Sequence, residues 1–300
     1  ERRVPQDGRL RLSLSANQII DFRVSTLPTA YGEKIVLRIL DRKSASVGIE
    51  ALGFEVEQRK IVMNTIGRPY GMMLVTGPTG SGKTVSLYTC LTLLNDSSRN
   101  ISTAEDPIEI PLSGINQVSI NEKTGLTFGI ALRAFLRQDP DVIMVGEIRD
   151  RDTAEMAIKA AQTGHLVLST LHTNDAPSAI TRLVDLGVAP YLLSATVIGV
   201  MAQRLLRTLC PHCKQPGGMR EEDEIAWNAL VAPWKASKPQ QIYRPAGCLE
   251  CRMTGFMGRI GIYEIMPMEM EIKRLVSNRA DLAKLREQAI RDGMKPLRIA

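Results

Sequence analysis

The sequence Gly71-Met-Met-Leu-Val-Thr-Gly-Pro-Thr-Gly-Ser-Gly-Lys83-Thr84-Val-Ser-Leu87 joins a short apolar run to a glycine-rich loop. The apolar residues before Gly77 predict a buried strand, and the apolar spacing from Val85 to Leu94 predicts a helix. Between them lies Gly-x4-Gly-Lys-Thr, which in this strand–loop–helix context predicts a phosphate-binding loop. A tight turn without a ligand is the alternative interpretation.

Each part of this loop has an expected role. Glycines let backbone N–H groups turn towards a phosphate, and the N-terminus of the helix adds a positive dipole. Lys83 is expected to reach the β- and γ-phosphates, and the Thr84 hydroxyl is expected to bind Mg²⁺. The predicted nucleotide-binding residues of the loop are Gly77, Pro78, Thr79, Gly80, Ser81, Gly82, Lys83, Thr84 and Val85.

Strand and helix patterns alternate after the loop. This alternation predicts an α/β fold with a mostly parallel sheet that is covered on both faces. Ligands of such sheets bind at the carboxyl ends of the strands, where the loop also lies. The expected strands are 101–104, 141–145 and 164–169, and the expected helices are 126–136, 153–163, 191–206 and 270–291.

Strand-like alternation also marks the N-terminal part, in 9–14, 19–25 and 34–40. We therefore predict the trailing part of a small α/β module there, ahead of a polar linker over 42–47. The predicted domains are 1–42 (small module), 43–66 (linker and helix), 67–208 (nucleotide-binding core), 209–266 (cysteine-containing subdomain) and 267–300 (C-terminal helical segment).

Composition limits the function classes. The 300 residues carry 38 Lys and Arg against 32 Asp and Glu, a net charge of +6 without a long basic run, and aromatic residues make up 4%. The scattered charge and the low aromatic content give little material for binding and stacking on bases, and predict no nucleic-acid partner.

No uninterrupted apolar run of 18 residues exists, so no membrane span is expected, and the first residues do not resemble a signal peptide. Because the chain lacks an initiator Met, we expect it to be a fragment.

The segment Asp141-Val-Ile-Met-Val-Gly146-Glu147 has the form of a Walker B strand, in which apolar residues precede an acid. Gly146 stands where a metal-binding aspartate is usual. Glu147 is therefore the predicted catalytic group that orients the attacking water. An exposed carboxylate at a strand end is the alternative.

Three further acids, Glu105, Asp106 and Glu109, follow a short strand. They could hold the hydration shell of Mg²⁺ or assist Glu147, or they could form an ordinary acidic turn.

His165 and His172 flank another strand, where a neutral histidine could donate a hydrogen bond to the γ-phosphate. Structural histidines are the alternative.

Arginines are candidates for neutralising charge in the transition state, including across a subunit boundary. Ion pairing at the surface is the alternative for any one of them. The candidates are Arg23 and Arg38 in the N-terminal strands, and Arg133, Arg137 and Arg149 near the Walker B strand.

Four of the five cysteines form two C-x-x-C pairs, Cys210/Cys213 and Cys248/Cys251. Four thiolates complete a closed tetrahedral site, so a structural Zn²⁺ is predicted, with unligated reduced cysteines as the alternative. His212 is not needed as a ligand. Cys90 lies in the helix after the phosphate loop and is expected in the core.

Together these segments resemble the assembly ATPases of bacterial type II secretion and type IV pilus systems. The Gly146 departure from an ordinary Walker B strand is itself a trait of that family. The resemblance covers nearly the whole chain and rests on Arg3–Arg9, Phe22–Pro28, Gly32–Lys34, the phosphate loop, Glu105–Glu109, Leu132–Asp150, Thr163–Asn174 and the four cysteines.

The resemblance implies a hexameric ring with ATP between a RecA-like domain and a small PAS-like module. Residues 105–109 correspond to the family's Asp box, and His165 and His172 to its His box. Arg23 and Arg38 match arginines that reach the nucleotide, and Arg133, Arg137 and Arg149 match arginines around the same site. The four cysteines occur in assembly motors and are missing from retraction motors.

The expected function is Mg²⁺-dependent ATP hydrolysis that drives the assembly of pilin or pseudopilin subunits. The resemblance implies an inner-membrane platform protein and a recruiting membrane protein as partners, at the cytoplasmic face of the membrane. Two other functions remain open: a nucleotide-dependent scaffold with little turnover, and a DNA-translocating RecA-like motor.

Overall fold

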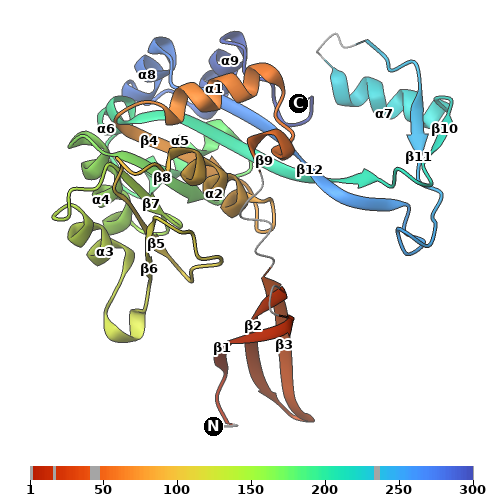
Figure 1. The fold of residues 1–300 in the computed structure, drawn as a ribbon. Helices are drawn as coiled ribbons and strands as arrows, with labels where there is room; N and C mark the ends of the chain where they lie inside the picture. Colours follow the sequence, from red (N-terminus) through yellow and green to blue (C-terminus); the bar gives the residue numbers. More distant parts are fainter. Residues whose placement is uncertain (1–2, 16–17, 41–47, 233–236, 300) are drawn as a thin grey trace.

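The computed structural model describes residues 3–15, 18–40, 48–232 and 237–299. The predicted linker over 42–47 lies outside the described residues. Among the described residues, a seven-stranded sheet forms the main body, in the order β12-β9-β4-β8-β7-β5-β6 (Figure 1). Its strands are β4 (Gly71–Thr76), β5 (Ile101–Glu105), β6 (Asn116–Ser119), β7 (Val142–Val145), β8 (Leu166–Leu171), β9 (Val197–Leu209) and β12 (Phe256–Pro267).

All neighbouring strands of this sheet run parallel except β12, which is antiparallel to β9. The interior strand β4 is buried at every residue, and its side chains alternate between two cores: Met72 and Leu74 enter one, and Met73 and Val75 enter the other. Helices cover both faces, which confirms the predicted α/β fold.

The core on the Met73 side is closed by α1 (Val56–Ile66), α2 (Lys83–Leu94) and the short helix η2 (Ile49–Leu52). The larger core on the Met72 side is closed by α3 (Phe128–Phe135), α4 (Arg151–Gln162), α5 (Ala176–Asp185), α6 (Pro190–Thr196), α8 (Met270–Ser277) and α9 (Leu282–Arg291). One more short helix, η3 (Glu122–Thr124), precedes α3.

The expected helix over 191–206 is wrong. Helix α6 ends at Thr196, and β9 begins at Val197, whose backbone is extended. Residues 197–201 are buried, and residues 199–201 pair with β4 on one side and with β12 on the other. A strand buried on both faces is apolar throughout and lacks the alternation that would distinguish it from a helix.

The expected single helix over 270–291 is two helices. Arg279 lies between α8 and α9 with a left-handed backbone, φ 52°, which interrupts helical hydrogen bonding. Asp281 then caps α9 by accepting a hydrogen bond from the backbone N–H of Lys284. The apolar spacing continues through the break and therefore does not reveal it.

The subdomain that contains the cysteines lies at the far end of the β9–β12 ribbon (Figure 1). It contains a small two-stranded sheet, β10 (Gln215–Gly217) and β11 (Ile242–Arg244), with helix α7 (Glu221–Val231). β12 starts at Phe256 and pairs with β9, so the last part of the expected 209–266 segment belongs to the main sheet. The C-x-x-C pairs lie at the end of β9 and before the start of β12.

The N-terminal module is an antiparallel sheet of β1 (Gln6–Ser15), β2 (Gln18–Thr29) and β3 (Gly32–Leu40).

 The central strand β2 (Gln18–Thr29) pairs with both others. The pairing register places Arg9, Arg23 and Arg38 in one row across the sheet, on the same face. Leu10, Phe22 and Ile39 form the neighbouring row on the opposite face.

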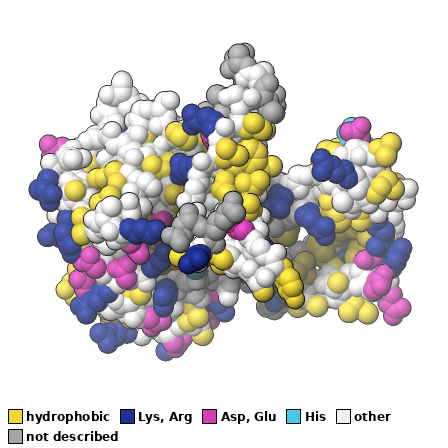
Figure 2. Space-filling view, turned by 90° about the horizontal axis from the view of Figure 1, so that it is seen from below, with side chains coloured by type: hydrophobic (Ala, Val, Ile, Leu, Met, Phe, Trp, Pro, Cys, Tyr) yellow, Lys and Arg dark blue, Asp and Glu magenta, His cyan; other side chains and the backbone are white. Residues whose placement is uncertain are grey.

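Charged side chains are spread over the molecule. Figure 2 shows Lys and Arg side chains dispersed among acidic and apolar ones on the face drawn there, with no single basic patch. None of the helices in the described ranges has the length and hydropathy needed to cross a membrane.

Candidate active site

The phosphate loop follows β4 directly and leads into α2, as the sequence predicts. Gly77, Gly80 and Gly82 all have positive φ, a conformation that side chains disfavour. A Cβ at Gly77 would lie 2.6 Å from the carbonyl oxygen of Gln203 and from Ser81 Oγ, so only glycine fits there. β9 thus packs directly against the loop.

Lys83 is buried and lies across the loop. Its Nζ donates to the carbonyl oxygens of Gly77, at 2.7 Å, and of Pro78, at 3.1 Å. Burial lowers the pKa of Lys83, the nearby Glu147 raises it, and Arg204 lowers it further. An anionic phosphate would offer this ammonium a stronger partner than two carbonyls.

A cleft of about 560 Å³ opens over the loop. It brings together the predicted catalytic and binding groups from four strand ends and from α2. Its lining includes Thr79, Gly80, Ser81, Gly82, Lys83, Thr84, Val85, Glu105, Asp106, Glu109, Gly146, Glu147, Arg149 and His172.

Glu147 lies at the end of β7 with its side chain 17% exposed. One of its carboxylate oxygens pairs with Arg149, and the other lies 3.6 Å from His172 Nε2. Arg149 also lies 3.7 Å from the carboxylate of Asp106. These contacts join the Walker B strand, the acidic segment and the second histidine in one cluster.

Burial lowers the pKa of His172, the charge of Lys83 lowers it further, and Glu147 opposes the shift. The imidazole is therefore neutral at pH 7, which leaves one ring nitrogen as a donor and the other as an acceptor. A neutral ring suits the role of donor to a terminal phosphate.

The structure gives a steric reason for Gly146. A Cβ at this position would lie 3.3 Å from the carbonyl oxygen of Ala104 and 3.5 Å from the Cα of Glu105. The end of β7 is therefore packed tightly against the end of β5, and an aspartate here would be crowded by backbone.

Glu105 is only 4% exposed, although it lines the cleft. Tyr88 donates a hydrogen bond to Oε2, and Thr103 and Gln117 donate to Oε1 at 2.6 and 3.0 Å. This carboxylate is held firmly on three sides. Its predicted assistance to Glu147 stays a prediction, and its neighbours Asp106 and Glu109 also line the cleft.

Three predicted nucleotide-binding residues lie elsewhere in the chain. His165 precedes the six-residue strand β8 and His172 follows it, so at ~3.3 Å per residue their backbones are about 23 Å apart. Arg133, Arg137 and His165 line a separate hollow of about 430 Å³, and Arg133 pairs there with Asp152. These three residues do not line the cleft over the phosphate loop, and their contact with a nucleotide stays a prediction.

Arg23 faces the acidic segment from the N-terminal module. A hollow of about 660 Å³ is lined by Arg9 and Arg23 on one side and by Asp106 and Pro107 on the other. Arg9 also donates to the carbonyl oxygen of Ile108. Arg38 neighbours Arg23 on β3 but is not among the residues that line this hollow.

The four cysteines of the two C-x-x-C pairs converge, with all sulfur atoms within 4.8 Å of one another. Cys210 and Cys248 are 3.9 Å apart, and Cys213 and Cys251 are 3.8 Å apart. A tetrahedral ion with Zn–S bonds of about 2.3 Å requires sulfur atoms about 3.8 Å apart, so this set fits Zn²⁺. His212 is not in the cluster, and Cys90 is a buried residue of α2, as expected.

Several residues at the cleft were not predicted. Leu205 and Arg259 line it from β9 and β12, and Tyr88 lines it from α2. Gln203 donates to the carbonyl oxygen of Ser81 at 2.7 Å. No local motif marks Gln203, Leu205 or Arg259, because β9 reaches the loop through its pairing with β4, and β12 through its pairing with β9.

Comparisons with known proteins agree with this geometry. The type IV pilus assembly ATPase PilB of Acinetobacter baylyi is 54% identical over 99% of the chain, and the type II secretion system protein E of Pseudomonas aeruginosa is 50% identical over 98%. The alignments cover 51% and 57% of those relatives, so the chain spans about half their length.

A solved structure of the pilus retraction motor PilT with bound ADP matches 98% of the chain and covers 75% of its own, at 27% identity and a TM-score of 0.67. The family model described as type II/IV secretion system protein matches residues 1–299. The chain belongs to the type II/IV secretion system protein family.

Proposed function

We propose that this chain is the motor part of a Mg²⁺-dependent ATPase that powers the assembly of pilin or pseudopilin subunits. The observation that carries the proposal is the cleft in which Lys83, Thr84 and Glu147 meet over the phosphate loop. The proposal extends to this chain the activity printed in the names of its pilus assembly relatives.

The residues of the cleft suit ATP and Mg²⁺. The exposed Thr84 hydroxyl and the carboxylates of Glu105, Asp106 and Glu147 are the oxygen ligands that Mg²⁺ prefers. When bound, the ion would neutralise phosphate charge. Because Gly146 supplies no carboxylate, Thr84 is the loop's own ligand for it.

Hydrolysis is assigned to the chain's own groups as follows. Lys83 moves from the loop carbonyls to the phosphates, Glu147 orients the attacking water, and neutral His172 donates to the terminal phosphate. Arg149 holds Glu147 by an ion pair and adds positive charge beside the cleft.

A ring of six chains would bring further arginines to each cleft. Arg23 and Arg38 lie in one row on the N-terminal sheet, and like charges side by side are unfavourable unless an anion or acid faces them. In this proposal they lie against the nucleotide of a neighbouring chain, and a platform protein and a recruiting protein at the inner membrane are further partners. On this proposal the motor works at the cytoplasmic face of that membrane, and the four cysteines hold a structural Zn²⁺.

The test is turnover of ATP by the Glu147→Gln variant. Gln keeps the shape but cannot act as a base, so the rate should fall by about 100-fold or more while ATP still binds. Glu155→Gln is the matched control, because Glu155 pairs with Arg151 on the surface of α4 and lies outside the cleft. Wild-type turnover in Glu147→Gln would refute the assignment.

A further inference from the structure

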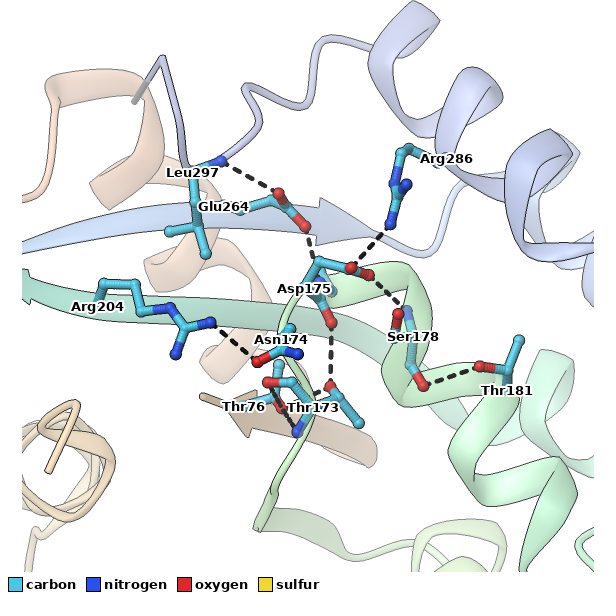
Figure 3. Close-up of polar contacts among 11 residues, drawn as sticks. Thr76, Thr173, Asn174, Asp175, Ser178, Thr181, Arg204, Glu264, Arg286 and Leu297 are labelled. Carbon is cyan, nitrogen blue, oxygen red and sulfur yellow. Dashed lines mark hydrogen bonds and ion pairs between the residues drawn. The ribbon is translucent and has the colours of Figure 1, made fainter. Parts of the chain in front are cut away.

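The loop between β8 and α5 carries His172 at its start and is held by distant parts of the chain (Figure 3). His172 faces Glu147, whereas residues 173–175 turn away from the cleft towards β4, β9 and the C-terminal helices. What holds these residues therefore sets where the His172 ring lies.

One end of the loop is fixed to the strand before the phosphate loop. Thr76, the last residue of β4, is fully buried, and its hydroxyl accepts a hydrogen bond from the backbone N–H of Thr173 at 2.9 Å. The two threonine hydroxyls are 2.7 Å apart. From β9, Arg204 donates to the Asn174 side chain at 3.0 Å.

The other end of the loop is fixed to the C-terminal part of the chain. Asp175 caps α5 by accepting from the N–H of Ser178 at 2.9 Å, and it pairs with Arg286 of α9 at 2.8 Å. Glu264 of β12 accepts from the N–H of Ala176 at 2.7 Å with one oxygen and from the N–H of Leu297 at 3.2 Å with the other.

Glu264 is a buried acidic residue outside the nucleotide cleft. It is 4% exposed, and it does not line the nucleotide cleft. Burial raises the pKa of its carboxyl group, the two backbone N–H donors lower it, Asp175 raises it and Arg286 lowers it. A buried carboxylate is costly unless donors satisfy it, and the two backbone donors here belong to separate segments, the start of α5 and the segment after α9.

We propose that Glu264 is a positioning residue for the active site: its two oxygens tie the start of α5 to the residue Leu297, and so hold the loop that carries His172. The inference rests on the proposed ATPase activity. Binding at the cleft and the position of the C-terminal segment are then coupled, and coupling of this kind acts in both directions. The segment after α9 that contains Leu297 thus responds to the terminal phosphate.

The test compares Glu264→Gln with Glu271→Gln. Gln keeps the size of Glu264 but replaces one acceptor oxygen with an NH₂ group that faces an N–H donor. Glu271 is a matched control, since it pairs with Arg274 on the exposed face of α8. We expect Glu264→Gln to lower kcat about tenfold, as for one charged buried hydrogen bond, with ADP affinity within about twofold of wild type. Glu271→Gln should leave both unchanged.

A second measurement separates positioning from a general loss of stability. If Glu264 acts through His172, the Glu264→Gln change has little further effect on kcat in a His172→Ala background. Equal losses in both backgrounds, or wild-type kcat in Glu264→Gln, would overturn the proposal.

Hydrogen exchange tests the same coupling in the wild-type protein, so the result does not depend on whether a variant folds. Addition of a non-hydrolysable ATP analogue should change the exchange of the Ala176 and Leu297 amides together, whereas ADP should change them less. A response at Ala176 without one at Leu297 contradicts the coupling. Absence of any ATP turnover in the wild type would instead refute the proposed function, while this exchange experiment would still report on the loop.

Discussion

Replacing Tyr88 with Phe tests how the cleft keeps a buried carboxylate in place. The Tyr88 hydroxyl donates to Oε2 of Glu105, and both residues are almost fully buried. The other two donors to Glu105, Thr103 and Gln117, both bind Oε1. In the described part of the chain, Oε2 therefore depends on Tyr88. Burial and the charge of Glu105 both raise the pKa of this phenol, so it stays protonated and able to donate.

Tyr88→Phe leaves one oxygen of a buried acid without its donor. Loss of a hydrogen bond to a charged group costs about 1.5–3 kcal/mol in the free energy of unfolding. A cost of about 2 kcal/mol corresponds to a decrease of about 4–8 °C in the melting temperature of a domain of this size. The variant should also lose part of its turnover, because Glu105 is expected to assist Glu147.

The measurement is thermal unfolding followed by circular dichroism, with Tyr31→Phe as control, since Tyr31 is fully exposed. The double variant Tyr88→Phe/Glu105→Gln should lose less than the sum of the two single losses, because the second change removes the charge that the first leaves unpaired. A melting temperature equal to that of the wild type in Tyr88→Phe would refute this reasoning.

Three further predictions follow from the site. Gly146→Ala should lower the free energy of unfolding in urea by about 1 kcal/mol, because its Cβ would lie 3.3 Å from the Ala104 carbonyl oxygen. Gly146→Asp should lower it more, since it also adds charge beside Glu147. Equal free energies of unfolding for the wild type and both variants would contradict this. Removal of Zn²⁺ by a chelator should make residues 210–255 sensitive to protease. In a measurement of bound metal, Cys248→Ser should hold no Zn²⁺, whereas Cys90→Ala should hold one ion per chain. Because the pKa of His172 is lowered from 6.5, the decrease in turnover caused by its protonation should have its midpoint below pH 6.5 and be missing in His172→Asn; a midpoint above pH 6.5 contradicts this.

The sequence was sufficient for features that depend on neighbours along the chain. The phosphate loop, β7 with Glu147, and the alternating N-terminal strands each carry a local pattern, and the structure contains all of them. The convergence of four cysteines also followed from their spacing. In each case the residues that form the pattern are also the residues that form the predicted structure.

Features that depend on distant pairing could not be predicted. The sequence over 191–206 favours a helix because the first part of β9 is apolar on both faces, and only the pairing of β9 with β4 and β12 decides its conformation. The same pairing brings Gln203 and Arg259 to the phosphate loop and Glu264 to the start of α5. His165 and His172 are close in sequence, yet the length of β8 separates them.

The most direct test of the account is ATP turnover per chain measured against protein concentration, for the wild type and for Arg23→Ala. Arg23 lies on the N-terminal sheet, outside the cleft of its own chain. If neighbouring chains complete each site, turnover per chain should rise steeply with concentration in the wild type and collapse in Arg23→Ala. A rate that does not depend on concentration and is unaffected by Arg23→Ala would mean that each chain hydrolyses ATP alone, which would contradict the account of a ring motor.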